Sequence, residues 1–355
     1  MKKNKKKTIL HILNSNSFSG AENVVLSIIC NLRNDYDFVY MSRDGSIRKI
    51  LEQYQIKHCL VSKLSVGEIK DAVKKYQPDV IHAHDFTAGI LSAATFTKIP
   101  IISHIHNNSP WLQSYGVYSF LYLASTVRYR DILTVSDSVM NEYVFGKYLK
   151  KKTSVVANPV DMNSVRERAA AAELCDESDV AFFGRLTEAK NPMLFLDIMN
   201  LLVQMDSTIT CAMIGDGDMR KQVEDRIKEL HLMDHVRMYG FQENPFGLIK
   251  NTRVVCMPSL WEGFGLTAVE SMALAKPVVA AKVGGLVDIV NETCGNFCEQ
   301  AKDYADTIYR YLTEEELLKK KSMGAIKRAE ELENLNDYIQ EIKTIYLKMG
   351  NVCVN

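Results

Sequence analysis

The stretch VVCMPSLWEGFGLTAVESMALAKPVV, residues 254–279, decides the fold. It starts with a short apolar run over residues 254–257, which predicts a strand that ends at a proline. A glycine-rich loop follows, and the next residues predict a helix over 267–275. A second apolar strand begins at Pro277. This succession of strand, loop, helix and strand is typical of a parallel sheet that helices cover.

The loop before the predicted helix carries residues that suit a polar ligand. Gly263 and Gly265 let the backbone approach a ligand closely. The first N–H groups of a helix have no internal partner, so they can bind an anion. Glu262 precedes the helix and Glu270 follows eight positions later, and both carboxylates can accept hydrogen bonds from hydroxyl groups. Together these groups predict a site for a phosphorylated sugar or a nucleotide.

Composition narrows the class of protein. The 355 residues suffice for two domains, and strand-like and helix-like stretches alternate throughout, which predicts an α/β fold. Lys and Arg total 43 and Asp and Glu total 43, so no net charge favours nucleic acid as a partner. The eight cysteines form no CxxC pattern and no secretory signal is recognised, so we expect a cytoplasmic protein. No apolar run reaches the roughly 20 residues that span a bilayer.

A pair of basic residues follows another predicted strand. Arg185 and Lys190 lie five positions apart in FFGRLTEAKNP, residues 182–192. A forked guanidinium and a point-charge ammonium together suit a diphosphate. Two solvated surface cations are the alternative, and the usual one for isolated residues of these types.

Histidines end two predicted strands of the first half of the chain. HAHD, residues 82–85, ends one strand, and HIH, residues 104–106, closes the strand predicted over 99–105. A metal site is one interpretation, but no third ligand with tight spacing is visible, so packing is favoured. Ligand crevices of open α/β sheets lie at the carboxyl ends of strands, which makes His106 a candidate site residue.

The first strand-to-helix turn contains SGAE, residues 19–22. Ser19 and Glu22 fit a capping box, in which the serine hydroxyl would accept from helix N–H groups. Gly20 at this turn would let a phosphate approach the backbone N–H groups. The capping role is favoured for Glu22, whereas Gly20 is a candidate for phosphate binding.

These segments resemble, in order and spacing, the retaining glycosyltransferases of family 4 in the GT-B class. The resemblance rests on SGAE at 19–22, SHIHN at 103–107, FFGRLTEAKNP at 182–192 and the E-x7-E segment that starts at Glu262. It implies two Rossmann-like, doubly wound domains facing across a cleft, and a last helix that crosses back to the first domain. VVANPVD, at 155–161, resembles the hinge of that family.

The resemblance also implies domain limits and residue roles. We expect an acceptor-binding domain at 1–160, a nucleotide-sugar-binding domain at 161–335 and a returning helix at 336–355. His106 and Glu262 would be catalytic, by holding the donor sugar. The residues expected to bind the donor nucleotide are Gly20, Arg185, Lys190, Gly240, Gly263, Phe264, Gly265, Leu266 and Glu270. The family usually has two glycines where this chain has Ser19-Gly20, which weakens the phosphate role of Gly20. No metal and no cofactor are expected.

The predicted function is retaining transfer of a hexosyl unit from a UDP- or GDP-sugar. The acceptor would be a hydroxyl of a saccharide or a lipid-linked saccharide, in surface polysaccharide biosynthesis. A UDP-N-acetylglucosamine 2-epimerase-like isomerase, a carbohydrate phosphorylase and a non-catalytic nucleotide-sugar-binding partner are the alternatives. The aromatic stretch at 111–123 predicts a core-packing helix, with peripheral docking on the cytoplasmic face of the membrane as a second hypothesis.

Overall fold

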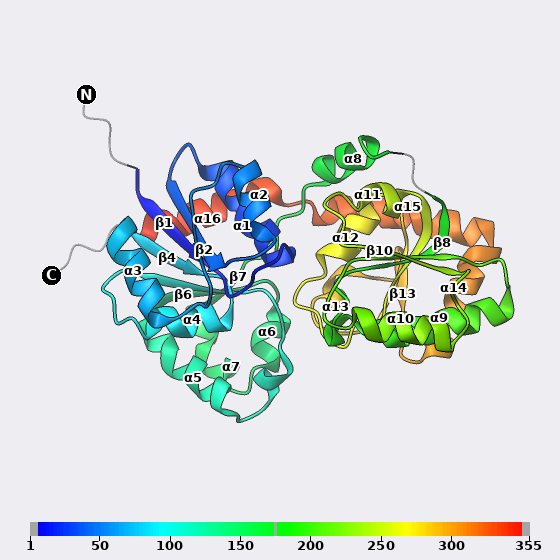
Figure 1. Cartoon of the computed structure of the whole chain (residues 1–355), viewed down its shortest axis with the longest axis horizontal. Coiled ribbons are helices and arrows are strands. Elements are labelled where there is room, and N and C mark those ends of the chain that lie inside the picture. Colours follow the sequence, from blue (N-terminus) through cyan, green and yellow to red (C-terminus); the bar gives the residue numbers. More distant parts are fainter. Residues whose placement is uncertain (1–5, 174–175, 350–355) are drawn as a thin grey trace. The chain divides into compact units, whose positions relative to one another are not determined.

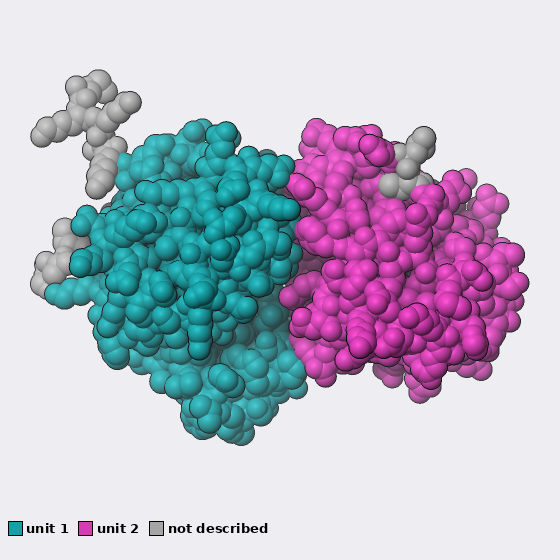
Figure 2. Space-filling model, in the orientation of Figure 1, with its two compact units in different colours: residues 1–159, 335–355 teal, residues 160–334 magenta. Residues whose placement is uncertain are grey.

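The computed structural model describes residues 6–173 and 176–349. The chain divides into two compact units, one of residues 1–159 with 335–355 and one of residues 160–334 (Figure 2). Each unit contains a parallel sheet with helices on both faces, which confirms the predicted α/β fold of two Rossmann-like halves (Figure 1). The last six residues of the predicted returning helix, 350–355, lie outside the described residues.

The first unit is built on a seven-stranded sheet of order β3-β2-β1-β4-β5-β6-β7. Its strands are β1 (Thr8–Ile12), β2 (Asp37–Arg43), β3 (His58–Val61), β4 (Val80–Ala83), β5 (Ile101–Ile105), β6 (Tyr129–Thr134) and β7 (Thr153–Val155). All neighbouring strands are parallel. The order reverses between β1 and β4, and such a switch point is where ligands bind in open sheets of this type.

Helices cover both faces of this first sheet (Figure 1). The helices of the first unit are α1 (Gly20–Leu32), α2 (Ile47–Gln53), α3 (Val66–Tyr76), α4 (Phe86–Ala93), α5 (Val117–Ser125), α6 (Asp137–Glu142), α7 (Gly146–Leu149) and α16 (Leu335–Met349). Short 3-10 turns occur at η1 (Pro110–Gln113), η2 (Thr126–Arg128) and η3 (Lys150–Lys152).

The second unit repeats the arrangement with six parallel strands in the order β10-β9-β8-β11-β12-β13. Its strands are β8 (Ser178–Phe183), β9 (Cys211–Ile214), β10 (Val236–Gly240), β11 (Thr252–Met257), β12 (Val278–Ala280) and β13 (Gly295–Phe297). Its helices are α8 (Met162–Ala170), α9 (Pro192–Met205), α10 (Arg220–Glu229), α11 (Phe246–Lys250), α12 (Leu266–Ala273), α13 (Leu286–Ile289), α14 (Ala301–Thr313) and α15 (Glu315–Leu332), with a 3-10 turn η4 (Glu188–Lys190). Here the switch point lies between β8 and β11.

The stretch 254–279 lies at the centre of the second unit, as its apolar residues predict. β11 is buried between β8 and β12, and Val254 and Val255 are fully inaccessible to solvent. The helix predicted over 267–275 is α12, which ends at Ala273. Ala275 has a φ of +63°, so the backbone leaves the right-handed conformation there and the helix cannot continue.

The aromatic stretch at 111–123 does not form the predicted continuous helix. A 3-10 turn, η1, is followed by an extended backbone at Gly116, and α5 begins only at Val117. Ser119 and Tyr122 are the fully buried positions of α5, whereas Tyr118 and Phe120 are 66% and 51% exposed. The predicted helix is therefore shorter than expected, and it packs on the core only through the narrow face that contains Ser119 and Tyr122.

The last helix, α16, packs on the first unit and returns the chain to the sheet where it began. Its Tyr346 is fully buried, and the ring lies edge-on against Tyr36 with 5.4 Å between the centroids. The Tyr346 hydroxyl is 2.8 Å from Nδ1 of His82 on β4. Lys343 adds an ion pair with Asp35 at 2.8 Å. The core of the first unit therefore contains side chains from both ends of the chain.

Replacing Tyr346 by Phe should lower the free energy of unfolding of the first unit by about 1–3 kcal/mol, because His82 Nδ1 loses its buried partner. Exposed Leu347→Ala on the same helix is the control and should change it by about 0.5 kcal/mol or less. The fluorescence of Trp111 during urea unfolding, in a Trp261→Phe background, reports this unit alone. Equal losses for both variants would contradict the importance of the hydroxyl contact.

Candidate functional site

Two loops meet at the carboxyl ends of β8 and β11, on either side of the switch point of the second sheet. Residues 184–191 follow β8, and residues 258–265 follow β11. The backbone N–H of Leu260 donates to the carbonyl oxygen of Ala189 at 2.8 Å and joins the loops. The fold thus brings the predicted residues of two distant motifs to one edge of one sheet.

Lys190 and Glu262 form an ion pair across these two loops. Their side chains are only 15% and 14% exposed, so this pair is shielded from solvent. The methylene chain of Lys190 lies over Gly184, where a Cβ would be 3.6 Å from the lysine carbons. Arg185 lies on the same loop with an exposed side chain, and no ion pair joins it to another residue in the described part of the chain.

The loop that carries Glu262 is held by the glycine pair Gly284-Gly285. Gly284 has a φ of +48°, and a Cβ on it would be 1.8 Å from the carbonyl oxygen of Glu262. The N–H of Gly285 donates to that same oxygen at 3.2 Å. The sequence suggests only a tight turn here, whereas the structure shows that the glycines also make room for another backbone segment.

The start of α12 has no side-chain cap, because its N-cap residue is Gly265 with a φ of +103°. Phe264 is buried before it, and Leu266 is the first helical residue. The N–H groups of an uncapped first turn, together with the helix dipole, favour an anion at this end. The predicted anion donors therefore lie at a helix terminus that can bind one.

Glu270 lies one turn further along α12 and is only partly accessible to solvent. Burial raises its pKa from 4.5 to about 7, against the opposing effects of the Arg168 and Lys190 charges. Among the charges that oppose this shift, Lys190 belongs to the loop that follows β8, and Arg168 lies on α8. A carboxyl group in this position would gain most from hydroxyl donors supplied by a ligand.

Gly240 lies at the end of β10 with a φ of +67°, and its carbonyl oxygen accepts from the N–H of Gly215 at 2.9 Å. A Cβ on Gly215 would in turn be 1.9 Å from the carbonyl oxygen of Gly184. The ends of β9 and β10 are thereby packed against the loop of Arg185. The predicted contact of Gly240 with a base remains a prediction.

In the first unit, the capping box predicted at Ser19 and Glu22 does not form. Ser19 occupies the N-cap position of α1, but its hydroxyl donates to the Glu22 carboxylate instead of accepting from the helix. The Ser15 hydroxyl donates to the other carboxylate oxygen. Glu22 is 1% exposed, and its charge in the first turn disfavours a second anion beside Gly20.

Five histidine rings gather at the switch point of the first sheet, although the sequence suggested only two pairs. His11 on β1 lies opposite His82 on β4, and its Nδ1 is 2.7 Å from Nε2 of His84. His84 Nδ1 is 3.0 Å from His106 Nε2, and His82 Nε2 is 3.3 Å from His104 Nδ1. In the sequence, His11 is a lone histidine inside an apolar strand, and nothing near it predicts a cluster. The parallel register of β1 and β4 brings its ring into contact with those of His82 and His84.

The cluster contains two groups of three histidines that could hold a metal ion. Within each group, one nitrogen of every ring lies within 4.8 Å of one nitrogen of each of the other two rings. The members of these groups are His11, His82 and His84, and His84, His104 and His106. Two ligands of one tetrahedral zinc lie roughly 3.3 Å apart, given Zn–N bonds of about 2.0–2.1 Å. The separations of 2.7 Å and 3.0 Å are those of hydrogen bonds, so these rings bond to one another.

Burial keeps all five rings neutral. It lowers the pKa of His11 to about 3 and that of His106 to about 4, and it holds the pKa values of His82, His84 and His104 well below 6.5. His106 is half-buried, but its Nε2 contacts His84 and its Nδ1 is inaccessible to solvent. The ring therefore turns both nitrogens inward.

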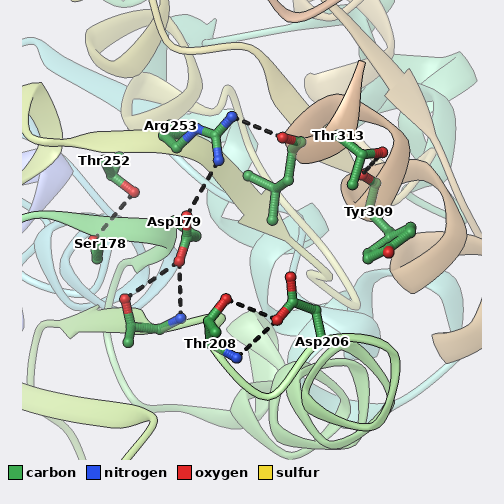
Figure 3. Close-up of polar contacts among 10 residues, drawn as sticks. Ser178, Asp179, Asp206, Thr208, Thr252, Arg253, Tyr309 and Thr313 are labelled. Atoms are coloured by element: carbon green, nitrogen blue, oxygen red, sulfur yellow. Dashed lines mark hydrogen bonds and ion pairs between the residues drawn. The ribbon is translucent and has the colours of Figure 1, made fainter. Parts of the chain in front are cut away.

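The opposite ends of β8, β9 and β11 border a hollow of about 450 Å³. Its polar groups bond to one another. Asp179 pairs with Arg253 at 3.3 Å, as Figure 3 shows for the two side chains, and accepts from the N–H of Thr210 at 3.0 Å. The Arg253 guanidinium also donates to the carbonyl oxygen of Leu312 at 2.8 Å. Because these groups already satisfy one another, this hollow is a weaker candidate than the carboxyl edge.

The raised pKa of Glu270 predicts a pH-dependent effect of Glu270→Gln. The folded state binds the Glu270 proton more tightly than the unfolded state does, so this contribution to stability is complete below pH 4.5 and is lost as pH rises through 7. The stability gained by Glu270→Gln should therefore grow between pH 4.5 and 7.5, by at most about 1.4 kcal/mol for each step of one in pH. Urea unfolding followed by Trp261 in a Trp111→Phe background measures it, and a difference that does not change with pH would contradict it.

The chain matches two family models. Residues 18–164 match the model of glycosyltransferase family 4, and residues 166–330 match that of glycosyl transferases group 1. An uncharacterized glycosyltransferase of Methanocaldococcus jannaschii is 30% identical over 61% of this chain, and the chain spans only 60% of that relative's length. The O-antigen biosynthesis glycosyltransferase WclY of Escherichia coli is 24% identical over 81% of this chain and 84% of its own.

Among solved structures, HepE of Anabaena in complex with UDP-glucose superposes with a TM-score of 0.84. The likeness covers 96% of this chain and 99% of HepE at 21% identity, and it shows that the fold is GT-B. Among the described residues, no helix has the length and apolar character to cross a membrane. Since the two family matches adjoin and cover residues 18–330 almost without a gap, the chain belongs to the family 4 glycosyltransferases.

Proposed function

We propose that the protein is a retaining hexosyltransferase that uses a nucleotide-diphosphate sugar, a UDP- or GDP-sugar, as its donor. The acceptor is a hydroxyl of a saccharide or of a lipid-linked saccharide, and the pathway is surface polysaccharide biosynthesis. The names of two similar proteins support this proposal, since HepE was solved with UDP-glucose and WclY acts in O-antigen biosynthesis.

The observation that carries the proposal is the shielded Lys190–Glu262 ion pair beside the uncapped start of α12. A nucleotide sugar offers each group a new partner: the diphosphate for Lys190, and the sugar hydroxyls for Glu262. Neither group would then be left as an unpaired, partly buried charge, which would cost several kcal/mol. Glu270 would accept hydrogen bonds from the ribose hydroxyls, and the backbone at Gly240 would contact the base.

Charge development explains why these residue types would accelerate the reaction. As the bond from the anomeric carbon to the diphosphate breaks, negative charge grows on the leaving phosphate and positive charge grows on the sugar ring. Lys190, Arg185 and the N–H groups at residues 263–266 would stabilise the leaving phosphate with donors that are already aligned. In this proposal their positive charge stabilises the leaving phosphate, so no metal ion is needed for that role.

The remaining roles follow from the same scheme. Glu262 would hold the sugar hydroxyls, and His106 would orient the sugar with its ring, because both of its nitrogens turn inward. The backbone of Gly20 would contact phosphate, although the buried Glu22 carboxylate opposes an anion there. Attack on the face that the diphosphate leaves would retain the anomeric configuration, with the departing phosphate taking the acceptor proton. Glu262 and Glu270 would therefore not act as the acid and nucleophile of a glycosidase.

An epimerase or a non-catalytic binding partner could use the same nucleotide-sugar groups. Release of nucleoside diphosphate separates the three functions, because only a transferase needs a saccharide hydroxyl to release it at a full rate. Nucleoside diphosphate release should therefore rise with acceptor concentration. Acceptor-independent conversion of the donor sugar would establish the epimerase, and binding without conversion would establish the partner.

Lys190→Ala and Glu262→Ala should each lower kcat by about 10²–10³-fold, because each removes a charged group from the reacting centre. Asp197→Ala is a matched control, since it breaks the Asp197–Arg226 ion pair between α9 and α10 in the same unit. Its transfer rate should stay close to that of the unchanged protein. Unchanged activity in both site variants would refute the assignment.

A second part of the proposal is peripheral docking of the first unit on an anionic membrane. Its apolar element is the α5 patch, which consists of the exposed side chains Tyr115, Val117, Tyr118, Phe120 and Leu121. The exposed lysines 147, 150 and 151 adjoin it through Phe145, whose ring lies 4.9 Å from that of Phe120. Exposed aromatic rings next to basic side chains suit a lipid surface with negative headgroups.

The triple variant Tyr115→Ser, Val117→Ser and Tyr118→Ser should bind vesicles that contain phosphatidylglycerol at least about tenfold more weakly than the unchanged protein. The reason is that three exposed apolar side chains can no longer insert into the membrane. The control is a double serine variant of Met233 and Met323, which are 59% and 63% exposed on the second unit. Co-sedimentation measures binding, and pure phosphatidylcholine vesicles separate the charge contribution. Equal binding of both variants would rule out the α5 patch as the docking surface.

A further inference from the structure

The five clustered histidines of the first unit form two separate hydrogen-bonded lines. One line runs from His11 through His84 to His106, with nitrogen separations of 2.7 Å and 3.0 Å. The other runs from Tyr346 through His82 to His104, with separations of 2.8 Å and 3.3 Å. Only the first line reaches His106, the residue proposed to orient the sugar.

A line of neutral imidazoles can carry its protons in only two arrangements. Each neutral ring has one N–H, so each ring donates at one nitrogen and accepts at the other. In the first arrangement His11 donates to His84, and His84 donates to His106 Nε2, which leaves the proton of His106 on Nδ1. In the second arrangement every bond is reversed and His106 Nδ1 carries no proton.

The ends of the line favour the first arrangement. His11 Nε2 and His106 Nδ1 are both buried without a partner among the described residues, so one of these two ends carries a buried N–H in either arrangement. The arrangement is decided by which end has an acceptor nearby: the Asn158 side-chain oxygen, at the His106 end, is itself buried without a hydrogen-bond partner among the described residues. Asn158 lies close enough to raise the pKa of His106 against the effect of burial, as an acceptor for an Nδ1 proton would.

We propose that His84, held by His11, is a positioning residue that fixes His106 as the neutral Nδ1–H tautomer. His84 donates to Nε2 of His106, so a second proton on His106 would have to reverse the whole line. An uncharged ring at this place would avoid repelling the positive charge that grows on the sugar. The benefit to catalysis rests on the proposed transferase function, whereas the tautomer itself does not.

The test is ¹⁵N NMR of the full chain with ring-labelled histidine, in which protonated and bare ring nitrogens have well-separated shifts. The chain has eight histidines, and loss of one signal set in His106→Gln assigns that ring. His106 should show a protonated Nδ1 and a bare Nε2 from pH 5 to pH 8. In His84→Phe, which cannot donate, that tautomer should be lost. In His84→Asn, whose amide can donate to His106, it should be retained.

His104→Phe is the matched control, because His104 is equally buried but belongs to the other line. The His106 shifts should change slightly, because the two ring centroids lie 4.1 Å apart, but His106 should keep its protonated Nδ1 and bare Nε2. Should His84→Phe fail to fold, His11→Leu tests the same line from its far end, since His84 then loses its donor and is free to reverse. Wild-type His106 with its proton on Nε2, or signals unaffected by both His84→Phe and His11→Leu, would overturn the proposal.

Transfer assays separate this proposal from the proposed function. His84→Phe should lower kcat by about 10–100-fold, the cost of misplacing a reacting group, with the donor KM within about twofold. His84→Asn should recover most of that loss. If the protein has the expected tautomer but no transfer activity, the proposed transferase function is refuted and the positioning of His106 by His84 stands. If His84→Phe has lost the tautomer but keeps full transfer activity, the role of the tautomer in catalysis is refuted.

Discussion

Direct contact between backbone segments holds the candidate site of the second unit together. No Cβ fits on Gly284 beside the carbonyl oxygen of Glu262, and none fits on Gly215 beside that of Gly184. Both loops at the switch point are therefore positioned by glycines on neighbouring loops, and not by the charges that they carry. The Lys190–Glu262 pair consequently forms at a place that the sheet has already fixed, which is the preorganisation that stabilising a developing charge requires.

The ion pair and the neighbouring carboxyl group also explain how such a site can stay stable without a ligand. Lys190 and Glu262 satisfy each other where both are shielded from solvent, and burial moves Glu270 toward its neutral form. Each of the three groups avoids an unpaired buried charge. A ligand with both an anion and hydroxyl groups can replace these partners together, whereas a simple anion would leave Glu262 unpaired. The arrangement thus favours ligands that combine the two chemistries.

The sequence predicted features that depend on local patterns. The strand predicted at 254–257 is present as β11, which begins two residues earlier, and the last helix is present as α16, which begins one residue before 336. β3, β7 and β13 were not predicted, because none of the three is a run of apolar residues like β12: their sequences are HCLV, TSV and GNF, whereas β12 is VVA. The Ser19 hydroxyl bonds to Glu22 because Ser15 helps to bury that carboxylate, and this choice depends on tertiary packing. α5 was expected to be a core helix because aromatic residues are usually buried, and no local pattern shows which face the rest of the unit leaves uncovered.

The histidine cluster depends on register, which no single stretch of sequence contains. His11, His82 and His104 come from three strands that neighbour one another only because the order reverses between β1 and β4. Because these rings are buried side by side, a positive charge on any of them is costly. Neutral rings can form hydrogen bonds to one another, which leaves unpaired only the nitrogens at the ends of each line. The nitrogens without partners, on His11, His104 and His106, are indeed those line ends. The protonation of a ring at the edge of the sheet is therefore set by rings inside it, so the fold determines the chemistry of His106 as well as its position.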